Sequence, residues 1–112
     1  PISGALIDSA GAVSAEVARA MSEGAVACSG SLAAVSTTGI AGPTGGTIRK
    51  PLGTVFIGCT VHGVTTVREF RFTGTRNEVR QRATFSALQM LRFRVLDLDV
   101  PTMCWQYGEV FA

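Results

Sequence analysis

Two β-type runs separated by only two residues limit the possible folds of this chain more than any other feature. Residues 54–61 and 64–72 are rich in β-branched and aromatic side chains, and His62-Gly63 lies between them. A two-residue connection that ends in glycine favours a β-hairpin with a tight turn. Phe70 and Phe72 alternate with charged residues, so we expect them to share one face of the strand. The histidine is then a turn residue, neither a metal ligand nor a catalytic base.

A helix is predicted ahead of these strands. Ser14 is a suitable N-cap, Glu16 lies in the first turn and Gly30 follows the last turn. The apolar residues recur at intervals of three and four, which predicts one buried stripe. Its members are Val17, Met21, Ala25 and Cys28.

A second helix is predicted after the hairpin. Thr75 and Glu78 form a capping box at its start, and the helix is expected to run to about Phe93. Its apolar stripe consists of Val79, Ala83, Ala87 and Met90 or Leu91. Arg76 and Arg80 lie one turn apart in the first two turns, so both guanidinium groups can converge on one anion beside the helix N-terminus. The alternative is an ordinary solvated helix start.

A short apolar strand at residues 32–38 leads into a glycine- and proline-rich segment at residues 39–53. That segment cannot sustain a helix or an interior strand. Long loops in compact domains are often functional, and successive glycine N–H groups can form an anion-binding nest or an oxyanion hole. The spacing is neither that of a P-loop nor that of a dinucleotide fingerprint. A wide turn without function is the alternative.

Composition narrows the class of protein. The 112 residues, 46% hydrophobic and 16% charged with a net charge of +2, fit one globular domain and argue against disorder. No apolar run is long enough for a membrane span. The three cysteines and one histidine have no metal-binding spacing, so we expect buried reduced thiols in a cytoplasmic protein. The arginines lack interleaved aromatic residues, which argues against nucleic-acid binding.

The order of elements is helix, strand, glycine-rich segment, hairpin, helix. It predicts an α/β fold in which helices pack against a mixed sheet, with residues 1–112 forming a single domain. Residues 95–112 have no clear period, although they contain Trp105, Tyr107 and Phe111, which are costly to leave exposed. This tail is expected to dock on the core or on another chain, and the sequence leaves both open.

Three segments of the chain resemble one protein family. GAVSAEVARAMSEGA, TTGIAGPTGGTIRKPLGTVFIG and FRFTGTRNEVRQRATFSAL are closely similar to the C-terminal domain of the competence/damage-inducible CinA family, over about residues 11–91. The resemblance implies a three-layer α/β/α fold that is often dimeric. Because stand-alone members are nicotinamide-mononucleotide deamidases, it also implies a bacterial cytoplasmic amidohydrolase that needs no metal or other cofactor. The implied reaction converts nicotinamide mononucleotide to nicotinic acid mononucleotide and ammonia.

The resemblance also implies site residues. Thr38 matches a hydroxyl that supports the active site. Arg76, and secondarily Arg80, match arginines that hold the substrate phosphate or orient the catalytic groups. The substrate-lining loop is matched by Gly39, Ile40, Ala41, Gly42, Gly45 and Gly46.

The chain departs from the family pattern in its first residues. The family places its serine nucleophile in an ESCTGG motif and its lysine base further along, both ahead of GAVS, and PISGALIDSA contains neither. Lys50 belongs to the loop, and Gln81-Arg82 reverses a common Arg-Gln order. We therefore expect a partial domain that lacks its N-terminal strand and helix and is inactive alone. Its open sheet would promote homo-oligomers. The alternative is a non-catalytic module that binds a nucleotide or a protein and oligomerises through the open sheet and the aromatic tail.

Overall fold

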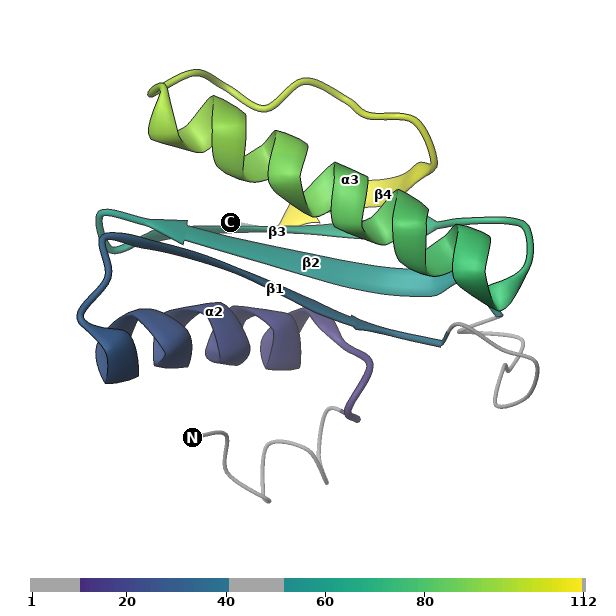
Figure 1. The fold of residues 1–112 in the computed structure, drawn as a ribbon, viewed down its shortest axis with the longest axis horizontal. Coiled ribbons are helices and arrows are strands. Elements are labelled where there is room, and N and C mark those ends of the chain that lie inside the picture. Colours follow the sequence, from purple (N-terminus) through teal and green to yellow (C-terminus); the bar gives the residue numbers. More distant parts are fainter. Residues whose placement is uncertain (1–10, 41–51, 112) are drawn as a thin grey trace.

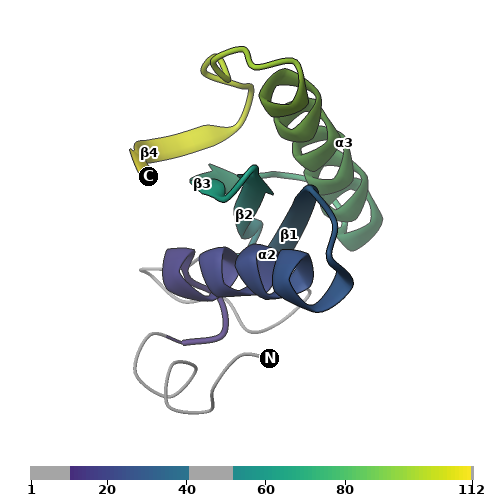
Figure 2. The same ribbon diagram turned by 90° about the vertical axis from the view of Figure 1, so that its left-hand side faces the viewer.

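The described part of the chain forms three layers. The computed structural model describes residues 11–40 and 52–111, with side chains described as far as Gly108. A four-stranded sheet has one helix on each face, α2 on one side and α3 on the other (Figures 1 and 2). The elements are α2 Ala15–Ser29, β1 Ala33–Gly39, β2 Thr54–Val61, β3 Val64–Arg71, α3 Arg76–Val95 and β4 Gln106–Phe111. The predicted α/β fold with three layers is confirmed.

The strand directions differ from the prediction. Every pair of neighbouring strands in the described sheet is antiparallel, in the order β1-β2-β3-β4, so the expected mixed sheet is wrong for this part of the chain. Parallel neighbours need a single crossover connection. Here β2 and β3 are joined by a tight turn. After β3 the chain reverses along α3, again through residues 96–105, and again into β4 (Figure 1).

The hairpin turn has the expected geometry. Val61 pairs with Val64, and the two residues between them have positive φ angles, 50° at His62 and 78° at Gly63. Positive φ at both central positions is the property of a type I′ turn, whose twist matches that of the strands. His62 is exposed in this turn, as the sequence predicts.

The two faces of β3 are also as predicted. The rings of Phe70 and Phe72 stack with their centroids 5.2 Å apart, and both side chains are buried under α3. On the other face Arg71 donates from Nε to Glu69 Oε2 over 2.9 Å. Strand alternation therefore separates an aromatic core from an ion pair.

Helix α2 begins and ends as predicted but presents a different face to the sheet. The Ser14 hydroxyl accepts from the Val17 amide, and Gly30 ends the helix with φ 71°. The side chains buried against the sheet are small, since helix and strand approach closely: a Cβ on Gly58 would lie only 2.6 Å from the Ala18 carbonyl oxygen. The predicted stripe is wrong beyond its first member. Its other members are partly or fully exposed: Met21, Ala25 and Cys28.

The cysteines need a second correction. Cys59 is buried on β2, whereas Cys28 and Cys104 are exposed, so the expectation of three buried thiols is wrong for two of them. Burial raises the pKa of the Cys59 thiol, although the nearby Arg94 opposes this shift. Cys28 lies beyond the closely packed first half of α2, which explains its exposure.

Helix α3 carries the larger core. The capping box is present, with Thr75 and Glu78 bonding each other's backbone N–H groups. The helix extends two residues past the predicted end at Phe93. Its buried residues include the predicted stripe and one serine: Val79, Ala83, Ser86, Ala87 and Met90.

The tail packs on its own chain. Arg68 is 7% exposed and donates to the carbonyl oxygens of Val100 and Pro101, both over 2.6 Å, and to Gln106 Oε1 over 2.9 Å. Burial lowers the pKa of this guanidinium group.

Within the described ranges, none of the helices is both long and apolar enough to cross a membrane.

Candidate functional site

The structure gathers part of the predicted site in a pocket of about 420 Å³ at the start of α3. Thr37 and Gly39 from the end of β1 form one wall, and Arg76 and Arg80 from the first two turns of α3 form another. The end of β1 lies beside the N-terminus of α3 because α3 packs across β1 and β2. The two predicted arginines and one predicted glycine therefore lie together.

The pocket is electropositive. The N-terminus of α3 adds partial positive charge and backbone donors to the two guanidinium groups. The Arg80 guanidinium makes no hydrogen bond or ion pair with any residue that the structure describes. A phosphate or carboxylate group would fit such a site.

Glu78 does not cancel this charge. Its carboxylate accepts from the Thr75 backbone N–H over 2.8 Å and lies 3.7 Å from Arg82. The Thr75 hydrogen bonds, with Arg82 nearby, lower the pKa of the Glu78 carboxyl. Arg82 also donates to the Thr73 carbonyl oxygen, so this capping cluster forms a separate group. Neither Glu78 nor Arg82 lines the pocket of Arg76 and Arg80, which we call the arginine pocket.

Thr38 lies on the other face of the sheet. Its hydroxyl donates to the Ala12 carbonyl oxygen over 2.7 Å, just ahead of α2. Alternation along β1 turns Thr37 toward α3 instead, so Thr37 shares the pocket with the arginines. Thr37 was not predicted, although the apolar Ala33 and Val35 on the same face could have indicated it. The supporting role of Thr38 stays a prediction.

The base of the glycine-rich segment adjoins this pocket. The Ile40 N–H donates to the Thr54 carbonyl oxygen over 2.9 Å, and the Ile40 carbonyl accepts from Gly53 over 2.6 Å. A Cβ on Gly39 would lie 2.6 Å from Val55 Cγ2, so only glycine fits there without displacement. The remaining predicted loop residues, Ala41, Gly42, Gly45 and Gly46, lie outside the described residues, as does Lys50.

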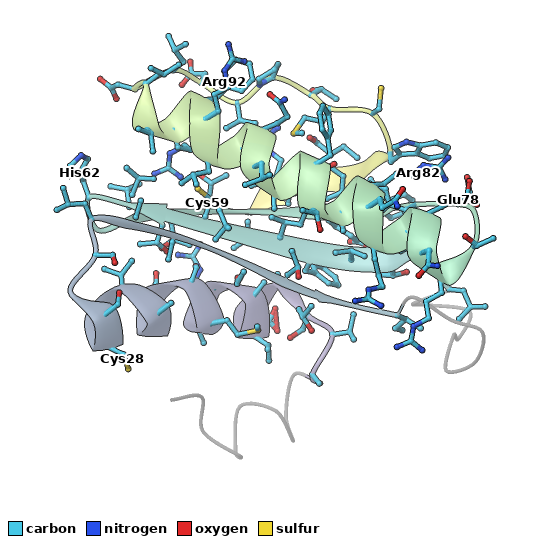
Figure 3. The ribbon with its side chains drawn as sticks, in the orientation of Figure 1. Cys28, Cys59, His62, Glu78, Arg82 and Arg92 are labelled. Atoms are coloured by element: carbon cyan, nitrogen blue, oxygen red, sulfur yellow. The ribbon has the colours of Figure 1, made fainter. Side chains whose placement is uncertain are left out.

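The other polar candidates lie elsewhere. His62 is at the opposite end of the sheet from Glu78 and Arg82 (Figure 3). Over residues 11–40 and 52–111 no three His, Cys, Asp or Glu side chains gather into a group that could hold a metal ion.

Comparison with known proteins decides the family. A sequence model of the CinA C-terminal domain matches residues 1–95. The chain belongs to the CinA C-terminal domain family. The matched CinA region ends where α3 ends, so residues 96–111, including β4, follow it.

Relatives with this CinA domain are much longer than the chain. A putative competence-damage inducible protein from Alkaliphilus oremlandii is 46% identical over 91 residues, which cover 81% of this chain and 22% of that protein. A CinA-like protein from Citrifermentans bemidjiense is 53% identical over 87 residues, covering 78% of this chain and 21% of that protein. The chain thus spans about a fifth of the length of these relatives.

Solved CinA structures share the fold. The competence/damage inducible protein CihA from Agrobacterium tumefaciens has a TM-score of 0.78 at 35% identity, over 81% of this chain and 56% of that one. The competence damage-inducible protein A (ComA) from Klebsiella pneumoniae has a TM-score of 0.80 at 28% identity, over 88% and 61%. Both agree with the three-layer arrangement described above.

Proposed function

We propose that this chain supplies the phosphate-binding part of a bacterial cytoplasmic amidohydrolase. The reaction converts nicotinamide mononucleotide to nicotinic acid mononucleotide and ammonia. The arginine pocket carries the proposal, since two guanidinium groups, a hydroxyl and a helix N-terminus meet beside the glycine-rich segment. A phosphate monoester suits these groups, because it can accept several charge-assisted hydrogen bonds at once.

The amide chemistry needs groups that the pocket does not contain. A nucleophile must attack the carboxamide carbon, the developing oxyanion must be stabilised, and the departing ammonia must receive a proton. In the family pattern a serine in an ESCTGG motif and a lysine perform the first and last steps, and the sequence printed here has neither. Water then releases the acid from the serine. The described residues contribute binding, with Thr38 as the proposed support, and neither a metal nor another cofactor takes part.

A second candidate is a non-catalytic nucleotide-binding module. The pocket holds groups that suit a phosphate, and the printed sequence contains no ESCTGG motif. Binding without turnover would be its whole activity.

Calorimetry with nicotinamide mononucleotide tests the pocket. The Arg80→Ala variant should bind at least about tenfold more weakly, because a hydrogen bond to a charged group contributes roughly 1.5–3 kcal/mol. Arg92→Ala is the matched control, since Arg92 is exposed near the other end of α3. Equal affinity of the two variants would contradict the phosphate site.

Ammonia release separates the two candidates. This chain should release none from nicotinamide mononucleotide. A longer chain that also carries the ESCTGG segment and the lysine should release ammonia if the amidohydrolase proposal holds. Binding by both chains with no release by either would support the non-catalytic module.

A further inference from the structure

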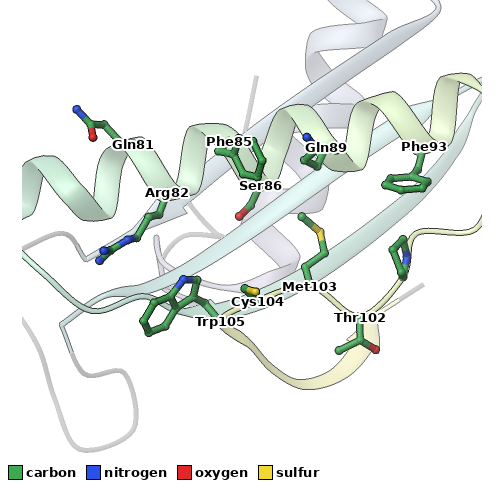
Figure 4. Close-up of a pocket in the computed structure, with 11 residues that line it drawn as sticks. Gln81, Arg82, Phe85, Ser86, Gln89, Phe93, Thr102, Met103, Cys104 and Trp105 are labelled. Carbon is green, nitrogen blue, oxygen red and sulfur yellow. The ribbon is translucent and has the colours of Figure 1, made fainter.

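A second cavity lies on the other side of α3, between that helix and residues 101–105 (Figure 4). Its volume is about 490 Å³, within the range of roughly 300–1,000 Å³ that small-molecule sites occupy. Phe85 and Phe93 line it from α3, and Met103 and Trp105 line it from the tail. We name it the α3–tail groove.

Ser86 gives this groove a polar group without a partner. The residue is 5% exposed, and its hydroxyl makes no hydrogen bond to any residue in the described ranges. Figure 4 shows the hydroxyl directed away from α3 toward the side where Cys104 and Trp105 lie. The hydroxyl oxygen itself is open to the groove, because among the described residues only Arg68 Nε is a buried side-chain polar atom without a partner. A ligand atom in the groove would supply the missing partner.

The aromatic walls favour a flat ligand. Phe85 and Trp105 are 63% and 43% exposed, so their rings offer open surface at the groove. Trp105 is held there with φ 69°, a left-handed conformation that a bulky residue adopts only under constraint from its surroundings. A planar ring can stack on such side chains.

The charge at the groove argues against an anionic ligand. Arg82 is the cation beside it, with its Cζ atom 5.2 Å from the centroid of the Trp105 ring. The same guanidinium group lies 3.7 Å from a Glu78 carboxylate oxygen and donates to the Thr73 carbonyl. The charge of Arg82 is therefore already balanced. A ligand without a phosphate or carboxylate gives up no binding free energy from an ion pair with this residue.

The geometry points to the α3–tail groove as a binding site for an uncharged, flat heteroaromatic ring with a hydrogen-bond acceptor that meets the Ser86 hydroxyl. The site is separate from the arginine pocket, which lies on the β1 side of α3 and shares no lining residue with it. Residues 101–105 follow the region that the family model matches, so this half of the groove lies outside the matched region. The inference does not depend on the proposed amidohydrolase.

Trp105 is the only tryptophan of the chain, so its fluorescence reports on the groove directly. We would titrate the protein with quinoxaline, an uncharged bicyclic ring with two acceptor nitrogens, and in parallel with naphthalene, which has none. Quinoxaline should change the fluorescence with a saturable, one-to-one dependence. Ser86→Ala should weaken quinoxaline binding about 2- to 10-fold, the effect of one hydrogen bond, and leave naphthalene binding unchanged.

Thr84→Ala is the matched control, because Thr84 is exposed on α3 and lines the arginine pocket instead. It should bind quinoxaline as the unmodified chain does, and circular dichroism should show both variants folded. A linear fluorescence change without saturation, or equal affinity of both rings for the unmodified chain, would overturn the proposal. Displacement of quinoxaline by nicotinamide mononucleotide would also overturn it, since the two pockets would then not be separate.

Discussion

Thr37 and Thr38 are neighbours in the sequence but face opposite sides of the sheet. Thr37 lines the pocket with Arg76 and Arg80, while the Thr38 hydroxyl is bonded to the Ala12 carbonyl oxygen ahead of α2. One residue is free to meet a ligand, and the other ties the entry of a helix to a strand. The chemical likeness of the two threonines hides this difference.

Replacing each threonine by valine separates the two positions. Thr37→Val removes a hydroxyl that lines the arginine pocket and keeps the side-chain shape nearly constant, so calorimetry should show weaker binding of nicotinamide mononucleotide with little change in stability. Thr38→Val removes an exposed hydrogen bond to the Ala12 carbonyl oxygen, which should lower the free energy of unfolding by about 0.5–1.5 kcal/mol. Urea denaturation measures that loss. The opposite assignment of effects would show that Thr38 meets the substrate.

At the scale of elements, the contact between α2 and the sheet depends on one glycine. A methyl group on Gly58 would lie 2.6 Å from the Ala18 carbonyl oxygen and 2.8 Å from Ser36 Oγ. Since Ser36 already donates to that carbonyl over 2.6 Å, neither atom can move without breaking the bond. Close approach at this point explains why small residues, and not the larger apolar ones, face the sheet.

Gly58→Ala should therefore destabilise the fold by about 1–3 kcal/mol, the usual cost of overpacking. Gly24→Ala is the matched control within the helix. A Cβ there meets nothing within 4 Å, so this change should stabilise the chain by roughly 0.5–1 kcal/mol. In thermal or urea unfolding, Gly58→Ala should be less stable than the unmodified chain and Gly24→Ala should be more stable. A neutral Gly58→Ala would mean that α2 can move away from the sheet at no cost.

Docking of β4 rests largely on Arg68. Arg68→Met should leave the Val100 and Pro101 carbonyl oxygens without donors, at a cost of about 1–3 kcal/mol each where they stay buried. Amide hydrogen exchange should then rise over residues 100–111 and stay unchanged in β2. Arg92→Met, at an exposed position, should change neither. Uniformly faster exchange would show that the tail unfolds only together with the core.

Local signals in the sequence predicted local structure well. The caps at Ser14 and Thr75 and the turn at His62 follow from contacts within a few residues, which the chain order displays directly. The buried face of α2 could not be predicted in this way. It is set by the close contact between Ala18 on the helix and Gly58 on β2, which are forty residues apart in the sequence. The mixed sheet was wrong for a similar reason, since strand direction depends on how often the chain reverses between β3 and β4.

The arginine pocket was predictable in part. Spacing along α3 placed Arg76 and Arg80 on one side of the helix, and the structure brings both together with Gly39. The partner on β1 required knowing which face of the strand meets α3. The α3–tail groove could not be predicted, because the tail shows no period that would place Trp105 beside Phe85.

At the scale of the whole molecule, the described sheet has two unequal edges. β4 covers β3, and its approach is fixed by Arg68 and by the Arg71 guanidinium, 3.9 Å above the Tyr107 ring. β1 and β4 each have one neighbour among the described strands, but β1 pairs regularly along its whole length whereas the pairing of β4 shows a register shift. Leu32, directly before β1, is 71% exposed. Open edges with exposed apolar side chains promote association.

We expect the chain to self-associate through the β1 edge. Sedimentation velocity over a range of concentrations should show dimers or larger species. Leu32→Lys should shift the chain toward monomer, because a charged side chain beside an edge strand must be desolvated when two edges pair. Leu96→Lys, at a position that is 57% exposed just past the end of α3 and outside β1, should leave association unchanged. A monomer at every concentration would contradict the role of the edge, whereas a larger effect of Leu96→Lys would move the contact to the α3 side of the molecule.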